Sequence, residues 1–276
     1  MTDNTDQAAF WGGAAGDKWV AQQALLDQQM LPVLEGVLQR AGLTEGQQVL
    51  DVGCGTGQST LAAARIVGPQ GHVLGADISP PMLGLARKRG EGTAQMSLDC
   101  VDVAEHPFEA ARFDAVVSRF GVMFFADPVA AFANIARAMK PGAQITFASW
   151  GQIERNPWFT LPARIAKEEI GAPPKTDPDA PGPFAFRDIA KVEGILRAAG
   201  LREVKGVAQN LRFTLPGGAR DFAALSNRIG PAERTMTYFQ SDAETRQRLV
   251  ARLTAAFGAL PDEAVPAEIN FFTARR

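Results

Sequence analysis

Short apolar runs alternate with segments of helical periodicity through the first half of the chain. Five runs have the length and apolar character of buried strands, at residues 48–52, 72–77, 95–101, 113–118 and 144–150. Helical segments follow three of them, at residues 58–67, 80–89 and 128–139. This alternation predicts an α/β fold in which helices cover both faces of a parallel sheet.

The flanking regions are less regular. Helical periodicity over residues 17–41 ends at Gly42, which predicts one helix before the first strand. Five prolines between residues 171 and 183 exclude a helix there and favour a surface loop or lid. Beyond this loop the pattern predicts helices at 188–199, 221–229 and 242–257, and strands at 201–215 and 267–274.

These patterns divide the 276 residues into three parts. We expect residues 1–45 to form an N-terminal helical cap segment and residues 46–150 to form the α/β core. Residues 151–276 would complete the core and carry two insertions, at 151–187 and 215–262, that would form a cover over a substrate. With 46% hydrophobic residues, the chain can fill one large core.

Three glycines at alternate positions follow the first apolar run, in the sequence VLDVGCGTG at residues 49–57. Gly53, Gly55 and Gly57 lie in a strand-to-helix turn, where the backbone passes close to a ligand because no Cβ atoms intervene. A dinucleotide turn has the spacing G-x-G-x-x-G and holds a pyrophosphate at a helix N-terminus. Here the third glycine comes one position early, and Asp51 precedes the loop.

This loop resembles that of class I S-adenosylmethionine (SAM) methyltransferases, in particular the type 11 family that includes ubiquinone and menaquinone biosynthesis enzymes. The resemblance extends over residues 48–150 and rests on the pieces at 49–57, 75–82, 100–108, 113–125 and 139–150. It implies a Rossmann-like, seven-stranded, mostly parallel sheet whose last strand is antiparallel. SAM contains an amino acid, a ribose and a sulfonium cation but no phosphate, so an acid beside the glycines suits it.

The resemblance also assigns roles to two acids at later strand ends. Asp77 follows the second run and would accept from the ribose hydroxyls, although alone it also reads as a helix N-cap. Asp102 follows the third run and would bind the adenine amino group, with the Val103 N–H on a ring nitrogen. The alternative for Asp102 is a solvated loop acid. The cofactor-binding residues that we expect are Trp11, Trp19, Asp51, Gly53, Cys54, Gly55, Gly57, Asp77, Ile78, Met82, Asp102, Val103, Arg119 and Phe120.

The segment at residues 118–125, SRFGVMFF, begins where the fourth strand ends. In the family it lies beside the methionine part of the cofactor and the substrate. Arg119 would pair with Asp51 or with a substrate anion. We predict an apolar substrate pocket whose walls include Met123, Phe124, Trp158 and Phe184, with Phe120, Phe159 and Phe186 near them. The alternative is that these aromatic side chains only pack the cover onto the sheet.

Two tryptophans flank a glycine-rich stretch between Phe10 and Trp19. Related enzymes fold such a segment over the cofactor, and an aromatic face near a sulfonium gains about 0.5–2 kcal/mol of cation–π attraction. We therefore expect Trp11 and Trp19 to belong to a cap. The alternative is that they pack the first helix onto the sheet.

Composition and charge exclude several other classes of protein. The net charge is −2 and no block of basic residues occurs, which argues against a nucleic-acid or anionic-membrane partner. Two cysteines and two histidines give no disulfide framework and no zinc site. The chain shows no signal peptide and no apolar stretch of about 18 residues, so we expect a cytoplasmic protein without a membrane span. A homodimer remains open.

The sequence shows no general base. His72 should begin the second strand, far from the carboxyl ends, and His106 should lie beside the adenine rather than the methyl group. We therefore name no catalytic residue, since in-line placement in a dry pocket can supply most of the acceleration for a good nucleophile.

The prediction is a SAM-dependent methyltransferase (EC 2.1.1.-) that acts on a small, apolar or aromatic molecule and leaves S-adenosylhomocysteine (SAH). Two alternatives stand beside it. One is a SAM-binding regulatory or partner subunit without catalysis, which the missing base keeps open. The other is an NAD(P)-dependent oxidoreductase, against which the early third glycine argues.

Overall fold

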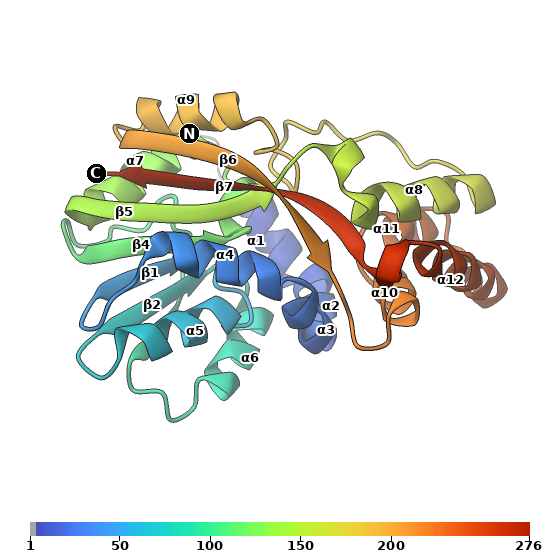
Figure 1. Cartoon of the computed structure of the whole chain (residues 1–276), viewed down its shortest axis with the longest axis horizontal. Helices are drawn as coiled ribbons and strands as arrows, with labels where there is room; N and C mark the ends of the chain where they lie inside the picture. Colours follow the sequence, from blue (N-terminus) through green and yellow to red (C-terminus); the bar gives the residue numbers. More distant parts are fainter. Residues whose placement is uncertain (1–3) are drawn as a thin grey trace.

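A seven-stranded sheet forms the centre of the computed structural model, which describes residues 4–276 (Figure 1). The strand order is β3-β2-β1-β4-β5-β7-β6. The strands are β1 (Gln48–Val52), β2 (His72–Asp77), β3 (Met96–Cys100), β4 (Phe113–Arg119), β5 (Met139–Trp150), β6 (Arg202–Phe213) and β7 (Val265–Arg275). The first five are parallel, and β7 runs antiparallel to both β5 and β6, which confirms the expected fold class.

Helices cover both faces of this sheet. One face carries α4 (Leu31–Ala41), α5 (Gln58–Val67) and α6 (Pro80–Arg89), and the other carries α7 (Pro128–Ala138) and α9 (Ile189–Ala198) (Figure 1). The inward stripe of α4 shows why it packs, because Val33, Leu34 and Val37 recur at helical spacing and are all buried. The alternation predicted from the sequence is confirmed over this region.

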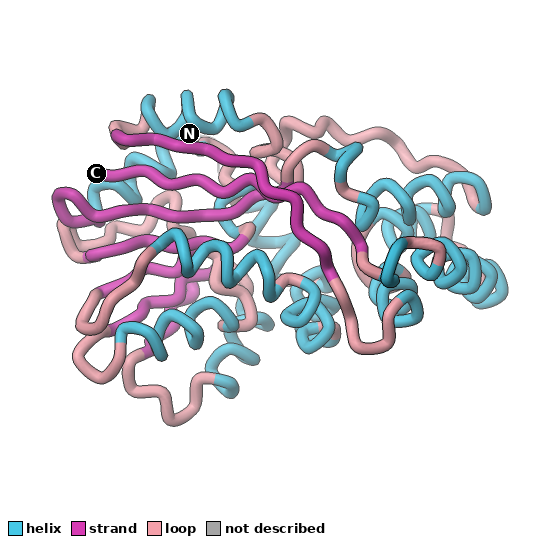
Figure 2. The backbone as a smooth tube through the Cα atoms, viewed as in Figure 1, coloured by secondary structure: helices cyan, strands magenta, loops and turns pink. Residues whose placement is uncertain are grey.

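A group of helices, which we call the helical cover, lies beyond the carboxyl ends of the parallel strands (Figure 1). It consists of α8 (Pro157–Glu169), α10 (Ala219–Ser226), α11 (Pro231–Tyr238) and α12 (Ala243–Gly258). Figure 2 shows that β6 and β7 continue past their neighbours as a ribbon that leads into this group. The sequence pattern predicted α10 and α12, but it missed α8 and α11, each of which has proline at its first position.

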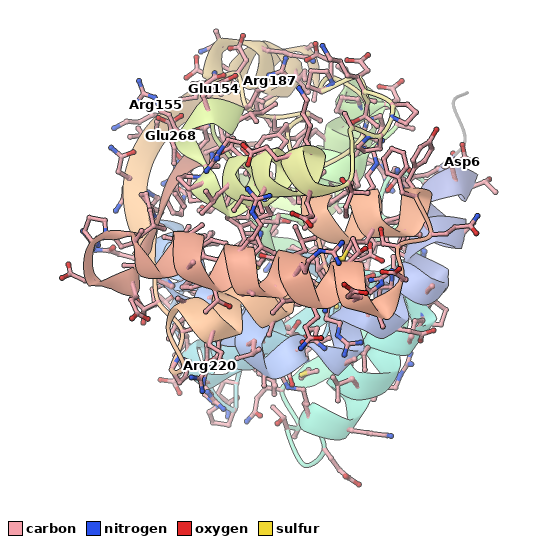
Figure 3. The ribbon with its side chains drawn as sticks, turned by 90° about the vertical axis from the view of Figure 1, so that its right-hand side faces the viewer. Asp6, Glu154, Arg155, Arg187, Arg220 and Glu268 are labelled. Atoms are coloured by element: carbon pink, nitrogen blue, oxygen red, sulfur yellow. The ribbon has the colours of Figure 1, made fainter. Side chains whose placement is uncertain are left out.

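A buried carboxylate joins the helical cover to the sheet. Glu268 of β7 accepts from the Gln152 backbone N–H (2.9 Å) and forms an ion pair with Arg155 (2.8 Å) where β5 leaves the sheet (Figure 3). Asn156 is fully buried and binds the backbone of Glu268 through both ends of its amide, at 3.1 and 3.3 Å. These contacts fix the direction in which the chain enters the cover.

The N-terminal region differs from the prediction of one helix over residues 17–41. It consists of α1 (Thr5–Gly12), α2 (Ala14–Ala21), α3 (Gln23–Gln29) and then α4. The break at Met30 has a physical cause in Pro32, which lacks an N–H and crowds the carbonyl of the preceding turn. Strand β5 also begins earlier than predicted, at Met139, and includes the Pro141-Gly142 turn as an irregularity in its register with β4.

Within residues 4–276, no helix has both the length and the apolar character needed to cross a membrane.

Candidate active site

The carboxyl ends of the parallel strands bring the predicted acids and the glycine loop to one edge of the sheet. Parallel pairing aligns Asp51 of β1 with Gly75 of β2, so that Asp77 lies just beyond it at the same edge. Asp77, Ile78, Asp102 and Val103 line a common cavity with Gly53, Val52, Ala76, Val101, Gly121, Phe124, Phe125 and Asn4. The cavity therefore brings together residues from the ends of four strands and from the N-terminal region.

Two backbone segments cross at this edge with no room for side chains. A Cβ atom on Gly53 would lie 2.5 Å from the Cα of Gly121, and a Cβ on Gly121 would lie 2.4 Å from the Val52 carbonyl oxygen. Gly53, Gly55 and Gly57 all have positive φ angles, of 66°, 55° and 85°. Glycine is the residue that adopts this conformation without steric cost, so the loop geometry explains the alternate spacing.

Asp77 is held rigidly by backbone donors. Its two carboxylate oxygens accept from the N–H of Gly55 and from the N–H of Ser79, each at 2.8 Å. Burial raises the pKa of Asp77 to about 6, although these backbone hydrogen bonds oppose the shift. The Ser79 side chain, rather than that of Asp77, caps the following helix by accepting from the Met82 N–H (3.4 Å). The N-cap alternative for Asp77 therefore does not describe its contacts.

Asp51 is fully buried with one oxygen satisfied and one free. Its Oδ2 accepts from the hydroxyls of Ser59 (2.6 Å) and Thr60 (2.7 Å), while Oδ1 has no hydrogen-bond partner. Burial raises the pKa of this carboxyl, against the lowering effect of the two hydroxyls and of the Arg119 charge. A buried carboxylate oxygen without a donor is suited to receive one from a ligand.

Arg119 lies between the core and the N-terminal helices. It donates to Gln58 and faces Asp27 of α3 at 3.9 Å, so its ion-pair partner is Asp27 rather than the expected Asp51. Asp27 also pairs with Arg89 (2.7 Å), which in turn donates to the Thr56 carbonyl inside the glycine loop (2.7 Å). The sequence analysis missed this ionic cluster, since nothing near Asp27 in the chain marks it as a partner of residues far away.

On the adenine side of the expected site, the loop after β3 is held from two directions. Asp102 accepts from the Ala104 N–H (2.9 Å), and Asn134 of α7 donates to the carbonyls of Val103 and His106 (both 2.9 Å). The His106 ring packs against Phe108 at 4.5 Å between centroids. Asn134 was not predicted, because on its own helix it reads as an ordinary polar position.

The N-terminal helices α1 and α2, which we call the N-terminal arm, lie against the β2–α6 turn. The Trp11 carbonyl accepts from the Ser79 hydroxyl (2.7 Å), and the Trp11 ring makes edge contacts with Trp19 (5.7 Å) and Phe124 (5.2 Å). Gly16 is buried there, and a Cβ on it would lie 2.2 Å from the Trp11 carbonyl oxygen. Lys18 of α2 forms an ion pair with Glu233 of α11, so the arm also contacts the helical cover.

An aromatic cluster follows the end of β4. Phe120 has a positive φ of 69°, which is rare for an aromatic residue, and its ring stacks on Trp150 at 4.8 Å with planes 6° apart. Trp150 makes an edge contact with Phe159 (4.8 Å), which in turn contacts Phe184 (4.7 Å). Rings from β4, β5, α8 and the proline-rich loop therefore meet beside the glycine crossing.

The other predicted pocket residues lie deeper. Trp158 packs on Phe222 and Phe257 in the interior of the helical cover, with centroids 6.2 and 6.4 Å away. Met123 is buried, and its carbonyl accepts from the N–H of Gly182 (3.1 Å), which ties the proline-rich loop to the end of β4. Phe186 stacks on Phe132 below the sheet edge.

Cys54 is buried beneath the glycine loop. Burial, together with the charges of Asp77 and Asp51, raises the pKa of its thiol well above the usual value. This environment makes the thiol a poor nucleophile. Among residues 4–276, no group of three or more His, Cys, Asp or Glu side chains is placed to hold a metal ion.

Three curated enzymes are similar to this chain. The nocamycin O-methyltransferase of Saccharothrix syringae is 32% identical over 199 residues, which is 67% of this chain and 70% of that enzyme. The aklanonic acid methyltransferase of Streptomyces sp. strain C5 is 41% identical over 38% of this chain and 48% of its own length. The demethylmenaquinone methyltransferase of Staphylococcus aureus is 36% identical over 40% of this chain and 45% of its own length. The last two matches thus span about half of each relative.

A family model described as a methyltransferase domain matches residues 49–142, from the strand before the glycine loop into β5. The phosphoethanolamine N-methyltransferase 2 of Haemonchus contortus, solved in complex with SAM, has a TM-score of 0.54 at 21% identity, covering 89% of this chain and 52% of that one. The [4+2]-cyclase SpnF has a TM-score of 0.52 at 21% identity, covering 89% of this chain and 80% of that one. These two structures show the shared fold.

The chain belongs to the class I SAM-dependent methyltransferases, whose cofactor is SAM. The residues at the sheet edge fit this cofactor on three observations. The glycine crossing leaves a cradle that any Cβ would fill, and the free Oδ1 of Asp51 offers an acceptor. Two further acids, Asp77 at the end of β2 and Asp102 after β3, line the same cavity.

Proposed function

We propose that this protein transfers the methyl group of SAM to a small apolar or aromatic acceptor. The observation that carries the proposal is the arrangement at the strand ends, where Asp77 and Asp102 line one cavity with the crossing glycines Gly53 and Gly121. The buried Asp51 lies near the end of β1, just before the glycine loop. When bound there, SAM supplies an electrophilic methyl group on a sulfonium sulfur.

Each part of the cofactor has a matching group in this arrangement. Asp77 would accept from the ribose hydroxyls, and Asp102 with the Val103 N–H would bind the adenine. The unpartnered oxygen of Asp51 is available for an ammonium group, directly or through a water. Met82 is buried and Ile78 is half-buried beside the turn, and both would pack on the nucleoside.

The acceptor would lie against the aromatic cluster of Phe120, Trp150, Phe159 and Phe184. Phe124, which contacts the Trp11 ring of the N-terminal arm, would add a further wall. These rings come from the sheet edge and from segments that cover it, so an acceptor among them would be shielded from water. A dry, preformed wall favours methyl transfer because it holds the nucleophile in line without solvent reorganisation. The relatives' names refer to polyketide and quinone compounds, which supports an acceptor of this kind.

The experiment has two stages. Calorimetry with SAH and with NAD tests the cofactor, and binding of SAH in the micromolar range with no NAD binding is expected. Labelled SAM is then incubated with phenols, quinols, amines and polyketide-like acids, and methylated product is expected from at least one of these classes. Tighter binding of NAD than of SAH would overturn the cofactor assignment, and methylation confined to peptides or RNA would overturn the acceptor class.

The same assay separates the enzyme from a non-catalytic SAM-binding subunit. The non-catalytic role is the second candidate function because the site shows no general base. Neither His72 nor His106 approaches the aromatic cluster. His72 binds Ser97 (2.8 Å) at the start of β2, and His106 lies on the adenine side. Turnover by the purified chain alone would exclude the subunit role.

A further inference from the structure

Asn4, at the start of the N-terminal arm, faces the nucleoside end of the cleft. It lines the cavity together with Asp77, Ile78, Asp102 and Val103. Its side chain is only 9% exposed, and its carbonyl oxygen Oδ1 is buried with no hydrogen-bond partner among the described residues. A buried amide oxygen without a donor costs free energy unless a water or a ligand supplies one.

The usual role of an asparagine at this position does not explain its orientation. Asn4 is the N-cap of α1, where asparagine normally accepts from an amide of the first helical turn. Here its side chain makes no capping hydrogen bond, and only its backbone carbonyl serves the helix, by accepting from Gln7 and Ala8 at 3.0 Å each. The side chain is therefore free to serve the cavity instead.

The packing of α1 points in the same direction. None of the residues within α1 is buried, and Phe10 of this helix is 57% exposed. The half-buried Trp11 ring of α1 packs on Trp19 and Phe124, but the one side chain buried at the start of this helix is the polar Asn4 in the cleft. Figure 3 shows Asp6 of the same helix at the molecular surface, where it is exposed to solvent.

We propose that Asn4 is a cofactor-binding residue that accepts a hydrogen bond from the adenosine part of SAM. Adenosine offers N–H donors on the adenine amino group and O–H donors on the ribose, and the neighbours of Asn4 are the residues expected to bind both. This inference rests on the proposed function, because it takes SAM as the ligand of the cleft.

The size of the cavity adds a consequence. Its volume is about 50 Å³, whereas sites for small molecules occupy about 300–1,000 Å³. Part of the lining must therefore move outward before a nucleoside can enter. Asn4 belongs to that lining and begins α1, a helix with no buried residue of its own, so α1 is the part that we expect to move.

The test compares Asn4→Ala with Asp6→Ala, which alters an exposed side chain of the same helix. Dissociation constants are measured by calorimetry for SAH and for 5′-methylthioadenosine, which keeps the adenosine but lacks the amino acid. Asn4→Ala should weaken the binding of both ligands by the same factor, about five- to tenfold. The reason is that one donor of the ligand loses its hydrogen bond and stays buried without a partner. Asp6→Ala should bind both like the unaltered chain.

Three results would overturn the inference. Unchanged affinity in Asn4→Ala would show that the amide makes no contact, and tighter binding would show that Asn4 only obstructs the cleft. Weakening of SAH without weakening of 5′-methylthioadenosine would place the contact outside the adenosine. If the unaltered chain binds neither ligand, the cofactor assignment fails instead. Circular dichroism of each variant checks that the fold is retained.

Discussion

At the scale of single residues, the site depends on backbone geometry as much as on side chains. The crossing of Gly53 and Gly121 brings β1 and β4 so close that neither position tolerates a Cβ. Asp77 then uses both oxygens to hold the Gly55 and Ser79 amides, which fixes the loop. Burial raises the pKa of this carboxyl above that of an exposed one, although the two amide hydrogen bonds oppose the shift.

The titration of Asp77 leads to a pH dependence of cofactor binding. Burial raises its pKa to about 6, and hydroxyl donors from a ribose would favour the ionised carboxylate. The affinity for SAH should therefore be constant above about pH 7 and fall below pH 6, by up to about tenfold per pH unit because each bound ligand then displaces one proton. Calorimetry between pH 5 and pH 8 measures this change.

The matched control is Asp77→Asn, which keeps the size of the side chain and removes the titration. It should bind SAH more weakly at pH 8, by about 1.5–3 kcal/mol as for hydrogen bonds to a charged group, with a flatter pH profile. Equal affinity of the unaltered chain at pH 5 and pH 8 would contradict the assignment of Asp77 to the ribose.

At the scale of elements, the N-terminal arm and the proline-rich loop close the same edge of the sheet. The arm reaches the β2–α6 turn through Trp11 and reaches α11 through Lys18. Residues 171–188 reach the end of β4 through Gly182, and Arg234 of α11 donates to Pro174 (2.9 Å). Helix α11 is therefore the element that both closing segments contact.

The backbone amides of the N-terminal arm should become more protected from hydrogen exchange when the cofactor binds. A ligand beneath α1 and α2 would add contacts to these helices, so local opening should become rarer. Hydrogen exchange followed by mass spectrometry should show slower exchange over residues 5–21 with SAH present. Helix α9, which lies with α7 on one face of the sheet, serves as the internal control, and its exchange should not change. The same exchange in the arm with and without SAH would identify it as a fixed structural element.

At the scale of the whole molecule, one ionic cluster connects the N-terminal region to the ligand-binding core. Asp27 of α3 faces Arg89 of α6 and Arg119 of β4, and all three side chains are largely shielded from water. Two arginines that share one carboxylate depend on it, because removal of the acid leaves positive charges close together at low dielectric.

Asp27→Ala should therefore lower the free energy of unfolding by about 3 kcal/mol, as for the loss of one partner of a buried ion pair. It should also weaken SAH binding, because Arg89 holds the Thr56 carbonyl in the glycine loop. Urea unfolding measures the first effect and calorimetry the second. Glu168→Ala is the control, since it loses contacts to Arg164 and Arg252 on the exposed surface and should change neither quantity appreciably. Equal losses in both variants would contradict a structural role for the cluster.

Much of the architecture was predictable because its causes are local. Apolar runs of strand length, three of them followed by a helical period, locate β1 to β4 and α5 to α7 within about two residues, whereas β5 begins at Met139, before its predicted start at residue 144. The missed helices α8 and α11 begin at prolines inside a region whose prolines and glycines favour loops, and their stability comes from packing against each other and α12. A helix that is stabilised mainly by tertiary packing has only a weak helical signal in its own sequence.

What the sequence by itself determined was the fold class and the cofactor, because strand periodicity and glycine spacing act over a few residues. Only the tertiary structure decided the partner of Arg119, the contact of Lys18 with Glu233 and the place of Asn4 in the cleft. The first two pairs are 92 and 215 residues apart, as 119 − 27 = 92 and 233 − 18 = 215. Nothing in the local pattern fixes such pairs, since they form only when the sheet edge, the N-terminal arm and the helical cover are brought together.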